Sequence, residues 1–133
     1  MHTLGIVGLG HLGEIHLKQW LEILPKTSIN CFDSDTEKLK LISDKYQVNS
    51  NTSYDDLLRK CTIIDVVTPT DTHHYYAALA LKHQKHVFIE KPVCTNMAEV
   101  EDLIALQNES KTIVQIGHVE RYNPAFQSVK DVI

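Results

Sequence analysis

The stretch Gly5-Ile6-Val7-Gly8-Leu9-Gly10-His11-Leu12-Gly13 decides how this chain is expected to fold. A short apolar run over residues 4–7 is typical of a buried β-strand, and glycines follow it in the spacing G-x-G-x-x-G. The first glycine allows a tight turn, the second lets a pyrophosphate approach the backbone, and the third lets a helix pack closely on the strand. The amino terminus of that helix directs N–H groups at the phosphates. The stretch predicts a dinucleotide site that includes Gly8, Gly10, His11, Leu12 and Gly13.

An acidic residue supports this prediction. Asp33 lies 20 residues after Gly13, at the end of a second apolar run over residues 29–32. A carboxylate at that place is expected to accept hydrogen bonds from the adenosine ribose. A glycine-rich turn without a ligand is the alternative, but the strand, the spacing and the acid together favour a dinucleotide.

The same region predicts NAD as the cofactor rather than NADP. Asp33 would repel a 2′-phosphate, no arginine or lysine stands at positions 34–36, and Lys38 is the nearest cation. NADP remains the alternative, because the Ser34 hydroxyl is able to bond a phosphate.

Bulk composition indicates a single soluble domain. The chain has 133 residues, and 43% of them are hydrophobic, which is enough for one core. Its net charge is −4 without a long run of either sign, so the charge does not indicate nucleic acid or an anionic membrane as a partner. Cys31, Cys61 and Cys94 are odd in number and far apart, as suits a reducing compartment. No apolar stretch is long enough for a membrane span, and the early first strand leaves no room for a signal peptide. We therefore expect a cytoplasmic protein.

Strand and helix patterns alternate along the whole chain. Strands are expected over residues 4–7, 28–33, around 48, 62–67, 86–89 and 112–116. Helices are expected between them, with Thr36, Ser53, Thr72 and Asn96 as amino-terminal caps. This alternation predicts an α/β fold, a doubly wound and mostly parallel sheet (Rossmann fold) of about six strands with helices on both faces.

Ligands of such sheets bind beyond the carboxyl ends of the strands. Several unusual segments fall at those ends: the glycine loop, Asp33, Thr68-Pro69, Glu90-Lys91-Pro92 and Gly117-His118. Their common position supports a cofactor crevice there.

Three of these segments resemble the successive signatures of the Gfo/Idh/MocA (glucose–fructose oxidoreductase / inositol dehydrogenase) family. They are Thr68-Pro69-Thr70-Asp71-Thr72-His73, Glu90-Lys91-Pro92 and Gly117-His118-Val119-Glu120-Arg121-Tyr122-Asn123-Pro124. The resemblance implies an NAD(P)-dependent oxidoreductase that transfers hydride between nicotinamide and a hydroxyl of a sugar, nucleotide sugar or cyclitol. The last segment is most similar to members that act on nucleotide-linked amino sugars.

The resemblance also implies a division of the chain. Residues 1–118 would be the NAD(P)-binding domain, and residues 119–133 would begin the connection to a C-terminal substrate domain that this sequence lacks. The isolated chain would then bind cofactor without turnover. A stand-alone, non-catalytic NAD(P)-binding or redox-sensing module is the alternative.

Roles for single residues follow from the resemblance. Lys91 is expected to contact the nicotinamide and the reacting hydroxyl as the catalytic residue, with Glu90 orienting it and a Lys91-Pro92 bond that is a candidate for the cis form. Further cofactor contacts are expected from Thr68, Pro69, His73, Glu90 and His118. For Lys91 the alternative is a solvated lysine, and for Thr68 and Pro69 a plain turn. Arg121 is expected to pair with Glu90 or another carboxylate, as a ligand contact or a structural ion pair.

Two further expectations concern metals and assembly. Eight histidines occur, but their spacing completes no ligand set, so no metal site is expected. Asn123 and Pro124 predict the start of a helix whose apolar stripe comprises Phe126, Val129, Val132 and Ile133. Without a covering domain this stripe favours self-association, so a homo-oligomer is expected.

Overall fold

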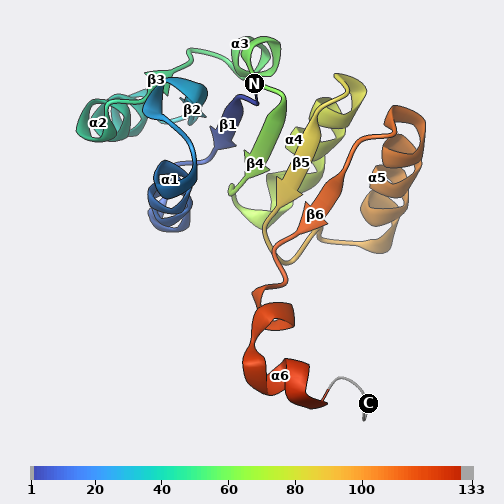
Figure 1. Ribbon diagram of the computed structural model, residues 1–133. Helices are drawn as coiled ribbons and strands as arrows, with labels where there is room; N and C mark the ends of the chain where they lie inside the picture. Colours follow the sequence, from blue (N-terminus) through green and yellow to red (C-terminus); the bar gives the residue numbers. More distant parts are fainter. Residues whose placement is uncertain (1, 130–133) are drawn as a thin grey trace.

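The computed structural model describes residues 2–129, and it confirms a doubly wound α/β fold (Figure 1). Six parallel strands form one sheet in the order β3-β2-β1-β4-β5-β6. The strands are β1 (Leu4–Val7), β2 (Ile29–Phe32), β3 (Asn49–Ser50), β4 (Ile63–Val66), β5 (His86–Ile89) and β6 (Val114–Ile116). The α-helices are α1 (His11–Ile23), α2 (Thr36–Tyr46), α3 (Tyr54–Lys60), α4 (Thr70–Lys82), α5 (Met97–Ser110) and α6 (Pro124–Val129). Two 3-10 helices, η1 (Lys26–Ser28) and η2 (Val119–Tyr122), complete the described elements.

Two apolar layers cover the two faces of this sheet. On one face Leu17 of α1 and Leu39 of α2 pack on Leu4 and Ile6. On the other face residues of α3, α4 and α5 pack on the alternate positions of the central strands, among them Leu57, Leu81 and Leu103. The alternation along β1 follows from the pleat, because successive side chains of a strand point to opposite faces. Helices therefore lie on both sides, as the sequence predicts.

The sheet reverses its strand order between β1 and β4. From β1 the chain proceeds to β2 and β3 on one side, and from β4 it proceeds to β5 and β6 on the other. The loops that leave β1 and β4 consequently diverge and leave a crevice at the carboxyl ends of these strands. The fold thus places the glycine loop and the Thr68-Pro69 segment on opposite sides of one opening.

Two predicted helix caps are wrong. Asp35, and not Thr36, caps α2, where its Oδ1 accepts the N–H groups of Glu37 and Lys38 at 3.1 and 3.0 Å. Asp35 reaches these groups because it directly precedes the first helical residue, whereas Thr36 already lies inside the helix. Helix α4 begins at Thr70, so Thr72 lies inside it and bonds back to Thr68 and Pro69.

The other two predicted caps are confirmed. Ser53 accepts the N–H of Asp56 at 3.1 Å, and Asn96 accepts that of Glu99 at 3.1 Å. Strand bounds are shorter than predicted by one or two residues at several ends.

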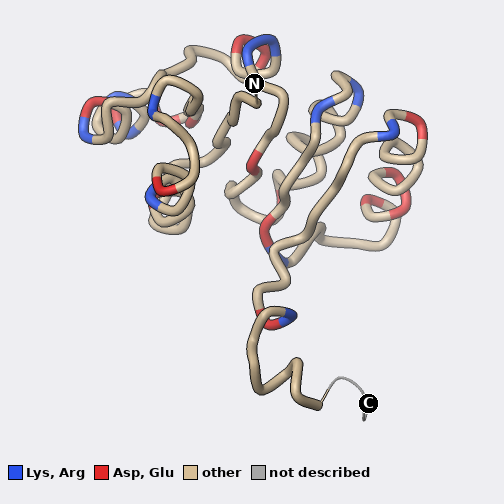
Figure 2. Tube along the Cα trace, viewed as in Figure 1, with Lys and Arg blue, Asp and Glu red and all other residues tan. Residues whose placement is uncertain are grey.

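The end of the described chain leaves the body of the domain. Helix α6 begins at Pro124 after Asn123, whose Oδ1 accepts the N–H of Ala125 at 3.0 Å, as predicted. Figure 1 shows η2 and α6 extending below the sheet, away from the other helices. Figure 2 shows both signs of charge interspersed over the body of the domain, whereas α6 carries none. Val132 and Ile133 of the predicted stripe lie outside the described residues.

Over residues 2–129 the structure contains no helix with the length and apolar character that crossing a membrane requires.

Candidate cofactor site

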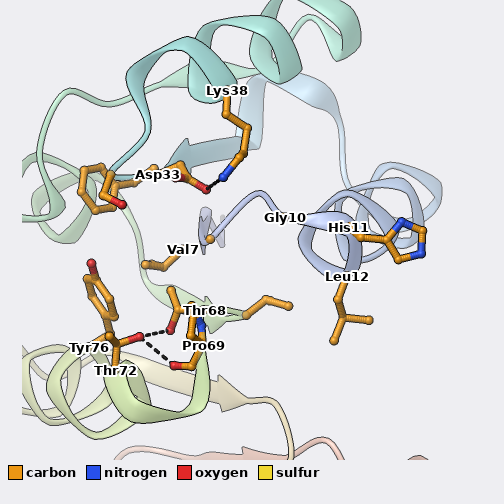
Figure 3. A pocket seen from close by; sticks show the side chains of 14 residues that line it. Val7, Gly10, His11, Leu12, Asp33, Lys38, Thr68, Pro69, Thr72 and Tyr76 are labelled. Atoms are coloured by element: carbon orange, nitrogen blue, oxygen red, sulfur yellow. Dashed lines mark hydrogen bonds and ion pairs between the residues drawn. The ribbon is translucent and has the colours of Figure 1, made fainter.

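A cleft of about 470 Å³ opens at the carboxyl ends of β1, β2 and β4 (Figure 3). Its lining residues are Val7, Gly8, Gly10, His11, Leu12, Phe32, Asp33, Ser34, Lys38, Val67, Thr68, Pro69, Thr72 and Tyr76. Seven of the residues predicted from sequence therefore come together around one opening: Gly8, Gly10, His11, Leu12, Asp33, Thr68 and Pro69.

The glycine loop forms one wall of the cleft, and its glycines differ in what they permit. Gly8 has a φ of +92°, and a Cβ there would lie 2.7 Å from the carbonyl oxygen of Val67. A Cβ on Gly13 would lie 2.0 Å from the carbonyl oxygen of Gly8, so only glycine lets α1 approach β1 this closely. A Cβ on Gly10 would meet no atom within 4 Å. The space over Gly10 is therefore available to a ligand.

The amino terminus of α1 borders that space. Gly10 is its N-cap residue and provides no side chain, so the first N–H groups of the helix have no side-chain partner. These N–H groups and the positive end of the helix dipole favour a bound anion such as a phosphate. The open space and the donor groups together fit a pyrophosphate.

Asp33 joins the glycine loop to β2. Its Oδ2 accepts the N–H of Leu9 at 2.7 Å, and its Oδ1 accepts the N–H of Asp35 at 2.8 Å. The residue is 8% exposed, and its exposed edge lies in the cleft. Each carboxylate oxygen keeps a second lone pair, so Asp33 is able to accept a further hydrogen bond from a ribose hydroxyl.

Lys38 lines the cleft, although from sequence it was predicted only to be the cation nearest Asp33. Its Nζ lies 3.6 Å from Asp33 Oδ2, and Figure 3 shows the ammonium directed at that carboxylate. Because α2 starts at Thr36, its first turn brings Lys38 back over the end of β2. A positive charge thus lies beside the acid that is expected to select the cofactor.

Two aromatic residues that were not predicted line the cleft beyond Asp33. Phe32 and Tyr76 lie with their ring centroids 6.5 Å apart, and Tyr54 contacts both rings. The Tyr54 hydroxyl donates to the carbonyl oxygen of Tyr76 at 2.7 Å, which fixes this part of α4. Burial, followed by the neighbouring Tyr75, raises the pKa of Tyr76, so its hydroxyl stays neutral. These two side chains give this wall of the cleft an aromatic character, which suits contact with a planar ring such as adenine.

His73 lies next to the cleft but not in its lining. Its ring is buried, with Nδ1 at 2.9 Å from the carbonyl oxygen of Pro92 and Nε2 at 2.8 Å from that of Thr68. It therefore links the loop after β4 to the loop after β5. The predicted contact of His73 with the cofactor does not match this position, because the ring is outside the cleft lining and both of its nitrogens face backbone carbonyls.

The Glu90-Lys91-Pro92 segment follows β5 at the same edge of the sheet. Glu90 is buried, Lys91 is exposed, and the Lys91-Pro92 peptide bond is cis. Glu90 Oε2 accepts the backbone N–H of Lys91 at 3.0 Å. His118 is exposed, and neither it nor Lys91 lines the cleft described above.

Two polar residues near Glu90, the half-buried His16 and the fully buried Asp65, were not predicted. His16 of α1 lies between two carboxylates: its Nδ1 is 3.0 Å from Asp65 Oδ2, and its Nε2 is 3.2 Å from Glu90 Oε1. Burial alone would lower the pKa of His16, but the hydrogen bonds and charges of Asp65 and Glu90 outweigh it and raise that pKa above its ordinary value. Asp65 gave a sequence signal, because a charged residue inside a buried parallel strand is unusual.

Arg121 is exposed and makes no ion pair with Glu90 in the described structure. Residues 2–129 also contain no group of three or more His, Cys, Asp or Glu side chains arranged as metal ligands.

Comparison with known proteins identifies the relatives of this chain. The family model GFO_IDH_MocA, described as an oxidoreductase family with an NAD-binding Rossmann fold, matches residues 2–118. UDP-N-acetylglucosamine 3-dehydrogenase of Acidithiobacillus ferrooxidans is 31% identical over 126 residues, which are 95% of this chain and 40% of that protein. Inositol 2-dehydrogenase of Salmonella typhimurium is 28% identical, over 97% of this chain and 40% of its own length.

Solved structures agree with these relatives. A structure of the Acidithiobacillus dehydrogenase superposes with a TM-score of 0.90 at 30% identity, covering 98% of this chain and 41% of that one. The chain thus spans about two fifths of the length of the relatives it matches.

Proposed function

Because this chain belongs to the Gfo/Idh/MocA oxidoreductase family and has its NAD-binding fold, we propose that it is the cofactor-binding half of an NAD(P)-dependent oxidoreductase. The reaction would move a hydride between the nicotinamide and a hydroxyl of a sugar, nucleotide sugar or cyclitol. Residues 1–118 would form the cofactor domain, and residues 119–133 would begin the connection to a substrate domain.

The observation that carries this proposal is the common edge of the sheet. The glycine loop after β1, Asp33 after β2 and Lys91 after β5 all follow carboxyl ends of parallel strands. Bound NAD would supply the hydride acceptor. The α1 N–H groups and the space over Gly10 would hold its pyrophosphate, and Asp33 would hold its ribose.

Lys91 would act on the substrate. Its ammonium would donate a hydrogen bond to the reacting hydroxyl oxygen. There it would stabilise the negative charge that develops as the hydroxyl proton passes to a base outside this chain and the hydride transfers from the substrate carbon to the nicotinamide. Glu90 would keep the backbone of Lys91 in place through the bond to its N–H. The names of the two dehydrogenases above support a substrate with ring hydroxyl groups.

The test of this role is Lys91→Ala in an enzyme that carries this chain together with a substrate domain. We expect NADH affinity within about threefold of the parent and a loss of turnover of about 10²-fold or more, because the lysine acts on charge that develops in the transition state. Lys82→Ala, at the exposed carboxyl end of α4, is the matched control and should change neither quantity. Near-normal kcat in Lys91→Ala would refute the catalytic role.

The alternative of a non-catalytic module is decided by the same assay. The 133-residue chain by itself should bind NADH without oxidising sugars, because it spans only two fifths of its relatives. The enzyme with both domains should turn over, and binding without turnover in that enzyme would favour the module.

A further inference from the structure

Three titratable side chains form a buried cluster beside the candidate site, outside the lining of the cleft. His16 comes from α1, Asp65 from β4 and Glu90 from the end of β5, with exposed side-chain fractions of 16%, 0% and 9%. Register pairs Asp65 with Ile6 of β1, whose side chain packs under α1, so Asp65 points to the face of the sheet that α1 covers. The cluster therefore ties α1 to two strands.

The hydrogen-bond geometry determines which atoms donate. Each ring nitrogen of His16 faces a carboxylate oxygen, at 3.0 Å to Asp65 and 3.2 Å to Glu90. An ionised carboxylate only accepts hydrogen bonds, so both contacts are satisfied when the imidazole carries a proton on each nitrogen. Asp65 Oδ2 also accepts the indole N–H of Trp20 at 2.7 Å, so this one oxygen faces two groups of α1.

The charge balance leads to the same protonation state. Asp65 is fully buried and its Oδ1 has no hydrogen-bond partner among the described residues. Burial of an unpaired charge is costly, so the acid needs a cation beside it. Within residues 2–129 the carboxylates at ion-pair distance from His16 are those of Asp65 and Glu90, and the Phe88 ring packs edge-on 5.8 Å away. His16 is thus the cation that faces Asp65.

Glu90 connects His16 to the backbone of Lys91, because its two carboxylate oxygens contact different groups. One oxygen, Oε1, faces His16, and the other, Oε2, accepts the Lys91 N–H at 3.0 Å. Gly117 makes room for this carboxylate, since a Cβ there would lie 2.6 Å from Glu90 Oε1. The orientation of the Glu90 carboxylate is therefore fixed from three sides.

We propose that His16 is a positioning residue: doubly protonated between Asp65 and Glu90, it holds the Glu90 carboxylate in the orientation that fixes the backbone at Lys91. The consequence for turnover rests on the proposed function of Lys91, whereas the protonation state and the backbone effect do not. Loss of the His16 proton removes the donor to one carboxylate, and the Lys91 backbone then loses its fixed partner.

The first test follows the histidine rings and the Lys91 amide by NMR between pH 5 and pH 9 in the 133-residue chain. His16 should keep its second proton above the ordinary midpoint of about 6.5, and the Lys91 amide resonance should shift with the same midpoint. The exposed ring of His83 serves as the internal reference. A His16 ring that is neutral at pH 6 would overturn the proposal. So would a Lys91 amide resonance that does not shift as His16 titrates.

A variant sharpens this test. Glu90→Gln keeps an acceptor for the Lys91 N–H but removes one negative charge, so the His16 midpoint should fall by about one pH unit. Asn108→Asp is the matched control, since it adds an exposed negative charge on α5, which packs on the opposite face of the sheet, and it should leave the midpoint nearly unchanged. An unchanged midpoint in Glu90→Gln would contradict the contact. The wild-type titration needs no variant and stands if Glu90→Gln fails to fold.

The second test measures turnover in the enzyme with both domains. His16→Gln should lower kcat by about tenfold while NADH affinity stays within about threefold, because a misplaced Lys91 affects the reacting centre and not the pyrophosphate site. The loss should be largest below the His16 midpoint and shrink above it, where the wild type has also lost the proton. A uniform loss at all pH values would indicate a merely structural role and contradict the proposal. If Lys91→Ala retains turnover, the proposed catalytic role of Lys91 fails while the NMR outcome keeps its meaning.

Discussion

At the scale of single residues, the cleft combines glycines that leave space for a ligand with charged residues that are expected to select between NAD and NADP. Gly10 leaves space and Gly13 allows the close approach of α1 to β1. Asp33 and Lys38 place opposite charges 3.6 Å apart at the position expected for the ribose. The two pairs lead to separate predictions, one about space and one about charge.

The glycine pair separates binding from folding. Gly10→Ala should leave the free energy of unfolding nearly unchanged, because its Cβ meets no atom, but should weaken NADH binding by about tenfold or more by occupying the pyrophosphate space. Gly13→Ala should lower the free energy of unfolding by about 2 kcal/mol or more, because its Cβ would overlap a backbone carbonyl. Fluorescence titration with NADH and urea unfolding measure the two effects. Equal effects of both substitutions on stability would contradict this assignment.

The charged pair governs the choice of cofactor. We expect tighter binding of NAD than of NADP, because Asp33 bonds the ribose hydroxyls and repels a 2′-phosphate. Asp33→Ala should narrow the difference, and Lys38→Ala should widen it, since Lys38 is the one lysine or arginine among the cleft-lining residues of the described chain. Calorimetric titration with both cofactors measures this. Equal or tighter NADP binding by the wild type would refute the preference.

At the scale of elements, α1 and α2 position several of the charged and polar groups of the site. Helix α1 presents its amino terminus to the cleft and sends His16 to the sheet, while the first turn of α2 returns Lys38 to Asp33. Glu14 of α1 joins the two helices, and its hydrogen bonds from Lys45 and Tyr46 lower its pKa to about 2. The packing of α2 on α1 and the position of its first turn therefore both affect the geometry of the cofactor site.

The cap of α2 gives a prediction at this scale. Asp35→Ala should lower the free energy of unfolding by about 1 kcal/mol, because two N–H groups of the first turn lose their acceptor. Thr36→Ala should change it by less than about 0.5 kcal/mol, because Thr36 lies inside the helix and is exposed. Urea unfolding of both variants provides the comparison. A larger loss of unfolding free energy in Thr36→Ala than in Asp35→Ala would instead identify Thr36 as the cap.

At the scale of the whole molecule, one end stands apart from the compact domain. Tyr122 and Val119 of η2 are 70% and 62% exposed, and Phe126 and Val129 of α6 are 45% and 43% exposed. No charged residue interrupts α6 (Figure 2). Apolar side chains that are exposed together on one segment favour contact with another surface.

The 133-residue chain should accordingly self-associate through this segment. Phe126→Glu should shift the population toward monomer, because it places a charge on the apolar side of α6. Ser128→Glu, an exposed position about half a turn around the same helix, is the control and should have little effect. Light scattering over a concentration series measures the assembly. A monodisperse wild-type monomer at high concentration would contradict the prediction.

The sequence by itself determined the order of the elements, the glycine loop and Asp33. These depend on local rules: apolar periodicity, the backbone freedom of Gly8 and the fixed spacing between loop and acid. The same local rules misplaced the amino-terminal caps at Thr36 and Thr72, because Asp35 and Pro69 are the cap residues in the structure. Which residue becomes the cap depends on where the first helical turn begins.

Only the tertiary structure decided the buried contacts. His16, Asp65 and Glu90 come from three elements, and α1 packing over a parallel sheet is what brings them within 3.2 Å of the central ring. His73 likewise meets Thr68 and Pro92 because β4 and β5 end side by side. The physical reason is that a buried polar group must find its partner in space, and packing, unlike the local pattern of the sequence, determines which distant residue that partner is.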